Sequence, residues 1–478
     1  FKADPFNAVV KNELDVMDKV DKYVTVRDGD VVMRLDPKEA PVLREYAMAL
    51  AHQALTTLAA RYEFTPRGPI LVEIFPKHDD FAVRTLGLPG MVGALGVCFG
   101  RVVTMDSPRA RPPGEFQWEA TLWHELAHVI TLQMSNQRIP RWLTEGISVY
   151  EEKKARAEWG REMDVAYAGM LNRGETLKLK DLNSAFTNPK TISLAYYEAS
   201  LLVEHIVNAY GEAGLRKLVR TFANGVDTDA ALKTALNTDL DQMQTGFDQT
   251  LERMFGAMRR AMAVPEGAGE LMKMPLPAVT TLAEANPRSF PVQMALGTAL
   301  RKAGEVDEAM QAFERAAALV PAAGGPGSPH EQLAQMALEK KDQARAISEL
   351  TALVAVDFNN VEAARQLADL LRQSGVEDAA KLMPIYQRVA AIDPFDPEAH
   401  AMLGRFALAR GEAEPASREF RAVIALGPVD KAAAFTDLGE SYFKGGKRAE
   451  AKKQVLLALE IAPGYERAQT LLLKLVDR

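Results

Sequence analysis

The stretch His124-Glu125-Leu126-Ala127-His128 has the pattern H-E-x-x-H, and it decides how the chain around it folds. The surrounding run 118–132 is rich in apolar residues and free of Gly and Pro, so we expect a buried helix there. On a helix, residues four apart lie on one face, so the two imidazoles can bind one metal ion from the same side. Glu125 then lies beside the metal and can accept a proton from water. The alternative is a core helix whose two His bond to backbone groups or carboxylates.

A second stretch, Ile139-Pro140-Arg141-Trp142-Leu143-Thr144-Glu145-Gly146, offers a third ligand. A catalytic zinc site needs three protein ligands and one open position. Pro140 suits the first turn of a new helix, and sixteen residues separate His128 from Glu145. That gap fits the end of one helix, a loop around 136–137 and the start of an antiparallel helix. We therefore expect Glu145 to face the two His. The alternative is a solvated helix Glu, although an unpaired charge in such apolar company would be costly.

Together these stretches resemble the gluzincin metallopeptidases, and most closely the bacterial peptidase MA-like proteins. The resemblance covers about residues 25–258 and is strongest over 118–152. It implies an α+β, thermolysin-like domain in which Glu125 is the general base of peptide hydrolysis. It also implies one zinc ion, with the ligands His124, His128 and Glu145.

The resemblance also points to a hydrogen-bond donor beside the metal. Gluzincins place a Tyr or His there, where it stabilises the oxyanion formed during hydrolysis. Aligning the helical stretch 194–203 with that pattern assigns this role to Tyr196, with Tyr197 in reserve. The alternative is that both rings belong to the core. His205, further along the same predicted helix, is interpreted as structural.

Glu152 is a candidate for orienting a metal ligand. It lies seven residues after Glu145 and can hold a zinc-bound His by its other nitrogen. The alternative is a solvated helix Glu. Thermolysin-like enzymes carry an Asp four residues after the third ligand, and Val149 stands there instead. Because of this difference, the sequence does not identify which residues form hydrogen bonds with the metal ligands.

The segment before the predicted metal helix is β-rich. The runs 31–35 and 70–75 predict strands, and an Ala/Leu-rich run over 41–62 predicts a helix between them. Residues 93–105 hold two short β-prone runs separated by Gly. In gluzincins an edge strand here binds the substrate backbone, and Gly would allow close approach. Plain hairpin packing is the alternative. Strands first and helices afterwards suit an α+β domain.

Residues 289–478 contain an internal repeat. Leu followed by a small residue recurs at spacings of 37, 34, 36 and 35, at Leu296, Leu333, Leu367, Leu403 and Leu438. Four of these five units have Ala thirteen residues later, and Pro closes units at 321, 394, 428 and 463. This resembles the tetratricopeptide (TPR) pattern of paired helices. Because one unit cannot bury its apolar face alone, we expect about five units to stack into an all-α solenoid, followed by a capping helix over 464–478.

Residues 1–24 read as an amphipathic helix with Val9, Leu14, Met17 and Val20 on its apolar side. Its opening, Asp4-Pro5-Phe6-Asn7, resembles the repeat junction at 393–396, which suggests further repeats before Phe1. The predicted organisation is a helical linker (1–24), a metallopeptidase domain (25–258), a connector (259–288) and the repeats (289–478).

Composition limits the classes of partner. The 478 residues are 47% hydrophobic and 25% charged, as in globular proteins with several domains. A net charge of −7 without a basic stripe argues against nucleic acid. The single Cys98 excludes an internal disulfide. No apolar run reaches the ~20 residues needed to span a membrane. By family analogy we favour the periplasm or the exterior, with the cytosol left open.

Two functions fit these patterns. The first is a zinc-dependent peptidase, with an endopeptidase preferred to an aminopeptidase because no residues stand out for gripping a free amino terminus. Its TPR arm would bind a peptide or protein substrate, or a protein partner, in a concave groove; a pure scaffold is the alternative. The second function is a TPR adaptor with a structural or weakly active zinc domain. Glu125 argues against it, because a structural site has no use for that carboxylate.

Overall fold

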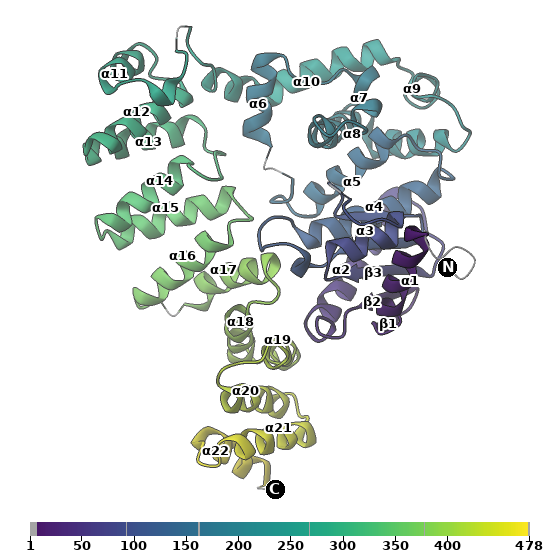
Figure 1. Cartoon of the computed structure of the whole chain (residues 1–478), viewed down its shortest axis with the longest axis vertical. Helices are drawn as coiled ribbons and strands as arrows, with labels where there is room; N and C mark the ends of the chain where they lie inside the picture. Colours follow the sequence, from purple (N-terminus) through teal and green to yellow (C-terminus); the bar gives the residue numbers. More distant parts are fainter. Residues whose placement is uncertain (1–6, 92, 161–162, 267, 377, 477–478) are drawn as a thin grey trace.

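The chain folds as a small mixed sheet covered by helices, followed by a column of paired helices (Figure 1). The computed structural model describes residues 7–91, 93–160, 163–266, 268–376 and 378–476. The predicted succession of an α+β part and an all-α part is observed. The finer expectation of a thermolysin-like arrangement remains a prediction, as do the predicted domain boundaries.

The sheet has five strands, and its three central strands run parallel. Their order is β1 (Val24–Asp28), β2 (Val31–Leu35), β3 (Ile70–Phe75), β5 (Val102–Asp106) and β4 (Gly96–Cys98). Both edge strands, β1 and β4, pair antiparallel with their neighbours. Parallel neighbours need crossover connections, which contain α2 (Ala40–Tyr62) and α3 (His78–Leu86). Met33, Val72 and Val103 pair in one fully buried row across the centre.

Helix α4 (Trp118–Met134) lies at the centre of the α+β part. It packs between α2 and α5 (Arg141–Ala155) and also contacts β4 and β5. A helix enclosed in this way must be apolar on nearly every side, which explains the continuous apolar run seen in the sequence. The remaining helices of this part are α6 (Asp164–Arg173), α7 (Leu179–Ala185), α8 (Ile192–Phe222), α9 (Thr228–Leu236) and α10 (Leu240–Ala261).

The N-terminal helix buries a different face from the predicted one. Helix α1 (Ala8–Val20) begins at the cap Asn7, and the rest of the Asp-Pro-Phe-Asn opening lies outside the described residues. Val16 and Val20, four residues apart, pack in a cluster with Phe75 and Phe81. Leu14 and Met17 point to solvent. Because α1 packs on α3 with the side that carries Val16 and Val20, the expected apolar set was wrong in part.

The repeats form five helix pairs within the described part of the chain, as the period predicts. The pairs are α12 (Phe290–Ala303) with α13 (Val306–Leu319), α14 (Pro329–Glu339) with α15 (Gln343–Val356), α16 (Val361–Gln373) with α17 (Ala379–Ile392), α18 (Pro397–Ala409) with α19 (Ala413–Ala425), and α20 (Lys431–Lys444) with α21 (Arg448–Ile461). Helix α11 (Leu276–Ala285) precedes them and α22 (Glu466–Val476) follows.

Small residues allow the two helices of a pair to approach closely. A Cβ atom added to Gly297 would lie 2.8 Å from the ring of Phe313, and one added to Gly404 would lie 2.6 Å from Phe420. The aromatic ring of the second helix therefore fills the space that glycine leaves in the first. This contact explains the glycine of the Leu-small pattern in these two units.

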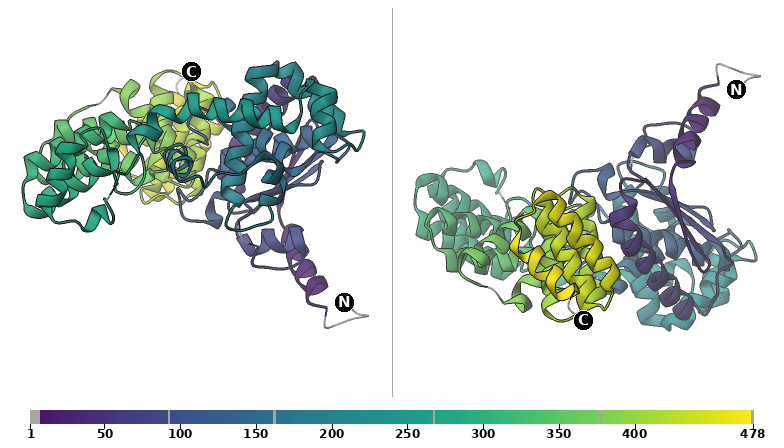
Figure 2. Two further views of the ribbon diagram at one scale, coloured as in Figure 1. Left: turned by 90° about the horizontal axis from the view of Figure 1, so that it is seen from above. Right: turned by 90° about the horizontal axis from the view of Figure 1, so that it is seen from below.

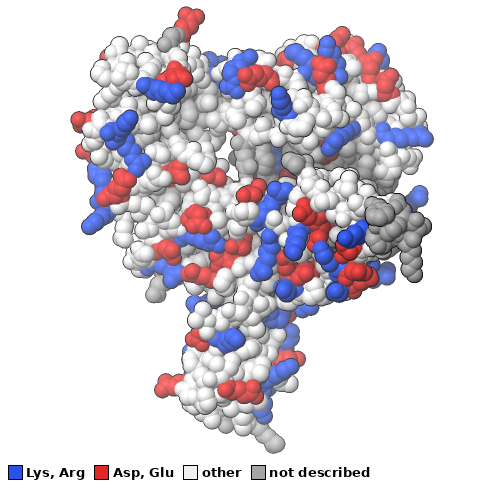
Figure 3. Space-filling view, viewed as in Figure 1, with Lys and Arg blue, Asp and Glu red and all other residues white. Residues whose placement is uncertain are grey.

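The column of repeats leaves the α+β part beyond α10 and touches it again at α17 to α19 (Figures 1 and 2). At the return point α19 packs on α2. Lys and Arg are interspersed with Asp and Glu over the face shown in Figure 3. None of the described helices is long and apolar enough to cross a membrane.

Candidate metal centre

The turn between α4 and α5 brings the two motifs face to face. After α4 the chain reverses through Asn136 and Gln137, whose φ angles of 52° and 63° are left-handed. Pro140 is the cap residue just before α5, where the sequence placed it in the first turn. Helix α5 then packs along α4. This antiparallel return is the arrangement that the sixteen-residue gap predicts.

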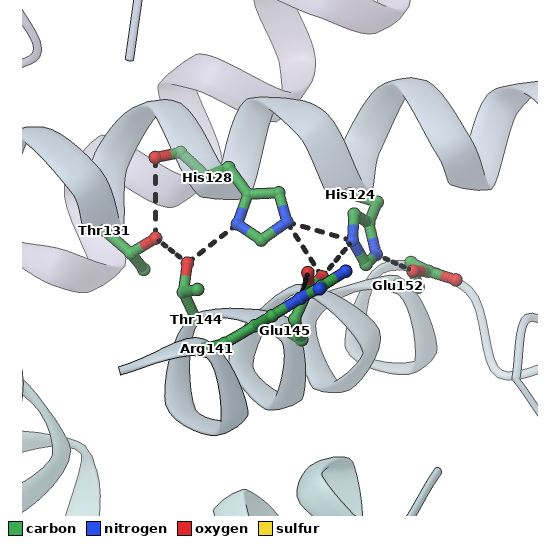
Figure 4. Close-up of polar contacts among 7 residues, drawn as sticks. All are labelled: His124, His128, Thr131, Arg141, Thr144, Glu145 and Glu152. Carbon is green, nitrogen blue, oxygen red and sulfur yellow. Dashed lines mark hydrogen bonds and ion pairs between the residues drawn. The ribbon is translucent and has the colours of Figure 1, made fainter. Parts of the chain in front are cut away.

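Three ligand atoms converge between these helices (Figure 4). The Nε2 atoms of His124 and His128 lie 3.1 Å apart. Glu145 Oε2 lies 3.2 Å from the first and 3.1 Å from the second. Ligands at zinc distances of ~2.0–2.1 Å in a tetrahedron are about 3.3 Å from one another. The triangle therefore has the size of one face of a zinc coordination shell.

The opposite ring nitrogens fix which atom faces the centre. Nδ1 of His124 lies 2.6 Å from Glu152 Oε1, and an ionised carboxylate can only accept, so this nitrogen carries the hydrogen. Nδ1 of His128 lies 2.7 Å from Thr144 Oγ1. Thr144 in turn lies 2.8 Å from Thr131 Oγ1, which donates to the carbonyl of His128. These partners leave both Nε2 lone pairs directed at the centre.

The electrostatics of the triangle favour positive charge at its centre. Burial lowers the pKa of His124, but hydrogen bonds with Glu145 and Glu152 outweigh it and place the pKa well above its usual value. Burial raises the pKa of Glu145, yet the charge of His128 and the bonds from both imidazoles bring it well below its usual value. A proton or a metal ion supplies the charge, and two imidazoles with one carboxylate form a zinc-binding set.

Glu125 lies beside the triangle with one oxygen free. It is buried, and its Oε2 accepts no hydrogen bond from the described residues. Burial raises its pKa, an effect opposed by His128 and His124. A Cβ atom added to Gly96 would lie 2.6 Å from its Oε1, so glycine lets the edge strand β4 pass against this carboxylate. A buried carboxylate oxygen without a partner fits a residue that exchanges protons with water at a metal site.

Of the two tyrosines, Tyr196 lies at the site. Its ring centroid is 6.1 Å from that of His124, and its other neighbour is Phe186 at 5.0 Å. Burial and the charge of Glu145 raise its pKa, while Arg141 lowers it, so the phenol stays protonated and can donate. Tyr197 bonds instead to Asp164 and packs on Tyr167. Consecutive helix residues point about 100° apart, which separates the two hydroxyls.

Arg141 and Thr144 belong to the site and were not predicted from the sequence. Arg141 Nε donates to Glu145 Oε1 at 3.2 Å, and its side chain lies alongside Glu145 in Figure 4. Thr144 orients His128. Arg141 lies four residues before Glu145 on α5, and Thr144 lies one residue before it. The sequence feature that could have identified them is a polar residue close to a predicted ligand. His205 lies 2.9 Å from Thr250 Oγ1, in keeping with its structural interpretation.

The candidate metal site lies inside a segment that matches a known family. Residues 50–253 match the family model of the Peptidase MA superfamily. None of the curated proteins compared with the chain matches it.

Solved TPR proteins align with the chain at low similarity. YrrB, described as a TPR protein with an unusual peptide-binding site, is 20% identical; the match covers 40% of this chain and 96% of YrrB, with a TM-score of 0.28. A thermophilic TPR protein from Thermus thermophilus is 23% identical over 39% of this chain and 100% of its own, with a TM-score of 0.22. A TPR protein from Parabacteroides merdae is 14% identical over 58% and 100%, with a TM-score of 0.22.

Proposed function

We propose that this chain is a zinc-dependent peptidase that hydrolyses bonds within a peptide or protein. The observation that carries the proposal is the convergence of three ligand atoms on one point, with the free oxygen of Glu125 beside them. The family match over residues 50–253 supports a peptidase-like domain. His124, His128 and Glu145 would hold the zinc ion, which would supply Lewis acidity for polarising a carbonyl and lowering the pKa of water.

Each of the surrounding residues then has a defined task. Glu125 accepts a proton from the attacking water at Oε2 and delivers it to the leaving amine. The hydroxyl group of Tyr196 donates a hydrogen bond to the oxyanion that forms on the substrate carbonyl. Glu152 and Thr144 hold the imidazoles so that both Nε2 lone pairs face the zinc. Arg141 holds Oε1 of Glu145, so that Oε2 is the atom that would face the metal.

The proposed activity is that of an endopeptidase. A free amino terminus would need a carboxylate partner in the site. The site carboxylates Glu145 and Glu152 are both bonded to His124. Neither is available to bind an amine. The TPR column, in this proposal, binds the substrate or a protein partner.

Metal content together with digestion of a peptide library tests the proposal. Wild type should contain one zinc per chain and cleave peptides, and His128→Ala should lose both. His52→Gln is the matched control, because the side chain of His52 is 42% exposed and pairs with Asp28 instead of the site residues. It should keep zinc and activity. Wild-type protein that binds no zinc, or a zinc-free His128→Ala with full cleavage, would contradict the proposal.

A further inference from the structure

A cavity of about 600 Å³ lies between the α+β part and the TPR helices. Tyr46 of α2 and Trp118 of α4 form one wall, and helices α17, α18 and α19 form the other. This volume falls within the range of ~300–1,000 Å³ that is usual for ligand sites. The metal triangle does not line the cavity, so the two sites are separate.

The cavity sits between fixed contacts of the two parts. The hydroxyl of Tyr46 donates to Glu419 Oε2 at 2.6 Å, and Arg421 donates to Glu45 at 2.8 Å. On the other side the indole nitrogen of Trp118 donates to the carbonyl of Ala391 at 3.0 Å. Because these bonds join the walls directly, the cavity is a built feature of the fold and not a loose gap between domains.

Most cations on the cavity wall already have partners. Arg156 pairs with Glu119 at 2.5 Å. Arg418 pairs with Glu419 at 3.0 Å, and Arg410 pairs with Glu412 at 2.6 Å. His400 lies 2.7 Å from the same Glu419. Each of these groups therefore already has an acidic partner, and Arg418 and His400 share Glu419.

Arg388 of α17 differs from them. Its Nη1 is buried and has no hydrogen-bond partner among the described residues. The guanidinium lies over the ring of Phe358, 4.4 Å from its centroid. Burial lowers its pKa, and the charges of Glu158 and Asp357 only oppose that shift from a distance. A buried donor without an acceptor is costly, so this guanidinium is a ready partner for an anionic ligand.

We propose that this cavity binds the free C-terminal carboxylate of a peptide through Arg388. A guanidinium matches the planar carboxylate with two parallel hydrogen bonds. The neighbouring wall is apolar at Trp118, Met383 and Leu403, which suits the side chains that precede the carboxylate. The wall also carries Glu158, whose negative charge acts on Arg388 and disfavours a doubly charged phosphate more than a singly charged carboxylate.

Binding of two matched peptides tests this site. The probes are acetylated leucyl-phenylalanyl-leucine with a free carboxyl terminus and the same peptide as its amide. Calorimetry uses the full chain carrying Glu125→Gln, so that the probes are not cleaved. The free acid should bind at least tenfold more tightly than the amide. Arg388→Gln should weaken binding of the acid at least tenfold, with Arg388→Lys between the two.

Arg410→Gln is the control, because Arg410 lines the same cavity but is already paired with Glu412. It should bind the acid within about twofold of the parent. A carboxylate also has affinity for zinc, so the loss in Arg388→Gln identifies the cavity as the site. Equal binding of acid and amide, unchanged binding in both Arg388 variants, or tighter binding of inorganic phosphate than of the acid overturns the proposal. None of these outcomes depends on the peptidase proposal.

Discussion

At the scale of single residues, the partners behind the ligands decide what the site can bind. Glu152 and Thr144 each occupy the outer nitrogen of one imidazole. Without them either ring could turn its N–H toward the centre and exclude a cation. The two motifs that carry the ligands would then be present in the sequence without forming a metal site.

Removing the Glu152 carboxylate should therefore weaken zinc binding. We expect Glu152→Ala to lower zinc affinity by about 10- to 100-fold. Glu152→Gln keeps an acceptor oxygen for Nδ1 and should fall between this variant and wild type. Competition with a chromophoric chelator measures the affinity. Glu158→Gln, an exposed glutamate beyond the end of α5, is the control. Unchanged affinity in Glu152→Ala would mean that this residue does not orient His124.

Gly96 is the residue that lets β4 approach Glu125. A methyl group there would lie 2.6 Å from Oε1 and would displace the carboxylate. Gly96→Ala should retain zinc and lose most of its peptidase activity, measured as initial rates beside metal content. Gly269→Ala is the control, since its Cβ would meet nothing within 4 Å. A fully active Gly96→Ala would show that Glu125 does not need its observed position.

At the scale of elements, close packing of α5 on α8 fixes the third ligand. A Cβ atom on Gly146 would lie 2.6 Å from the carbonyl oxygen of Ala199. Helix propensity alone would make Gly146→Ala stabilising by about 1 kcal/mol. The clash with backbone should reverse that sign and destabilise the protein by about 1–3 kcal/mol. Chemical unfolding measures the difference, and a more stable variant would refute the contact.

Glu39, at the start of α2, gives the fold a dependence on pH. Burial raises its pKa from 4.5 to about 7, although the hydrogen bond from Ser107 opposes the shift. The folded state therefore binds this proton more tightly than the unfolded state. Its contribution to stability is complete below pH 4.5 and is lost as the pH rises through 7.

Glu39→Gln removes this titration and keeps an acceptor for Ser107. Between about pH 4.5 and 8 the wild type should lose stability relative to the variant, on the order of 3 kcal/mol. Urea unfolding of both proteins across that range gives the difference. Parallel curves for the two proteins would show that Glu39 keeps an ordinary pKa in the folded chain.

At the scale of the whole molecule, the repeats do more than extend from the α+β part. They return to it through α17 to α19, and the hydrogen-bonded group of Tyr46, His400 and Glu419 joins the two parts. Burial raises the pKa of Tyr46, as does Glu419, so the phenol stays protonated and donates across the junction. This junction encloses the cavity and places a helical column next to the N-terminal end of the metal helix.

Features set by local spacing could be predicted from the sequence. Helical periodicity places His124 above His128, and the Leu-small period predicts the five helix pairs. Features set by tertiary contact could not. Thr144 and Arg141 look like ordinary polar residues until α4 lies against α5. The return of α17 to α4 and of α19 to α2 was equally hidden, because each repeat resembles its neighbours in sequence. The buried face of α1 depends on α3 in the same way.

Zinc content and peptide cleavage, measured together in wild type and Glu125→Gln, test whether Glu125 is the general base of a zinc-dependent peptidase. Glu125 is not a ligand in the observed triangle, so the variant should bind one zinc per chain as wild type does. Its cleavage rate should fall at least about 100-fold, because the free carboxylate oxygen that moves the proton is gone. A variant that keeps zinc and cleaves at the wild-type rate would contradict the assignment of Glu125 and with it the proposed mechanism.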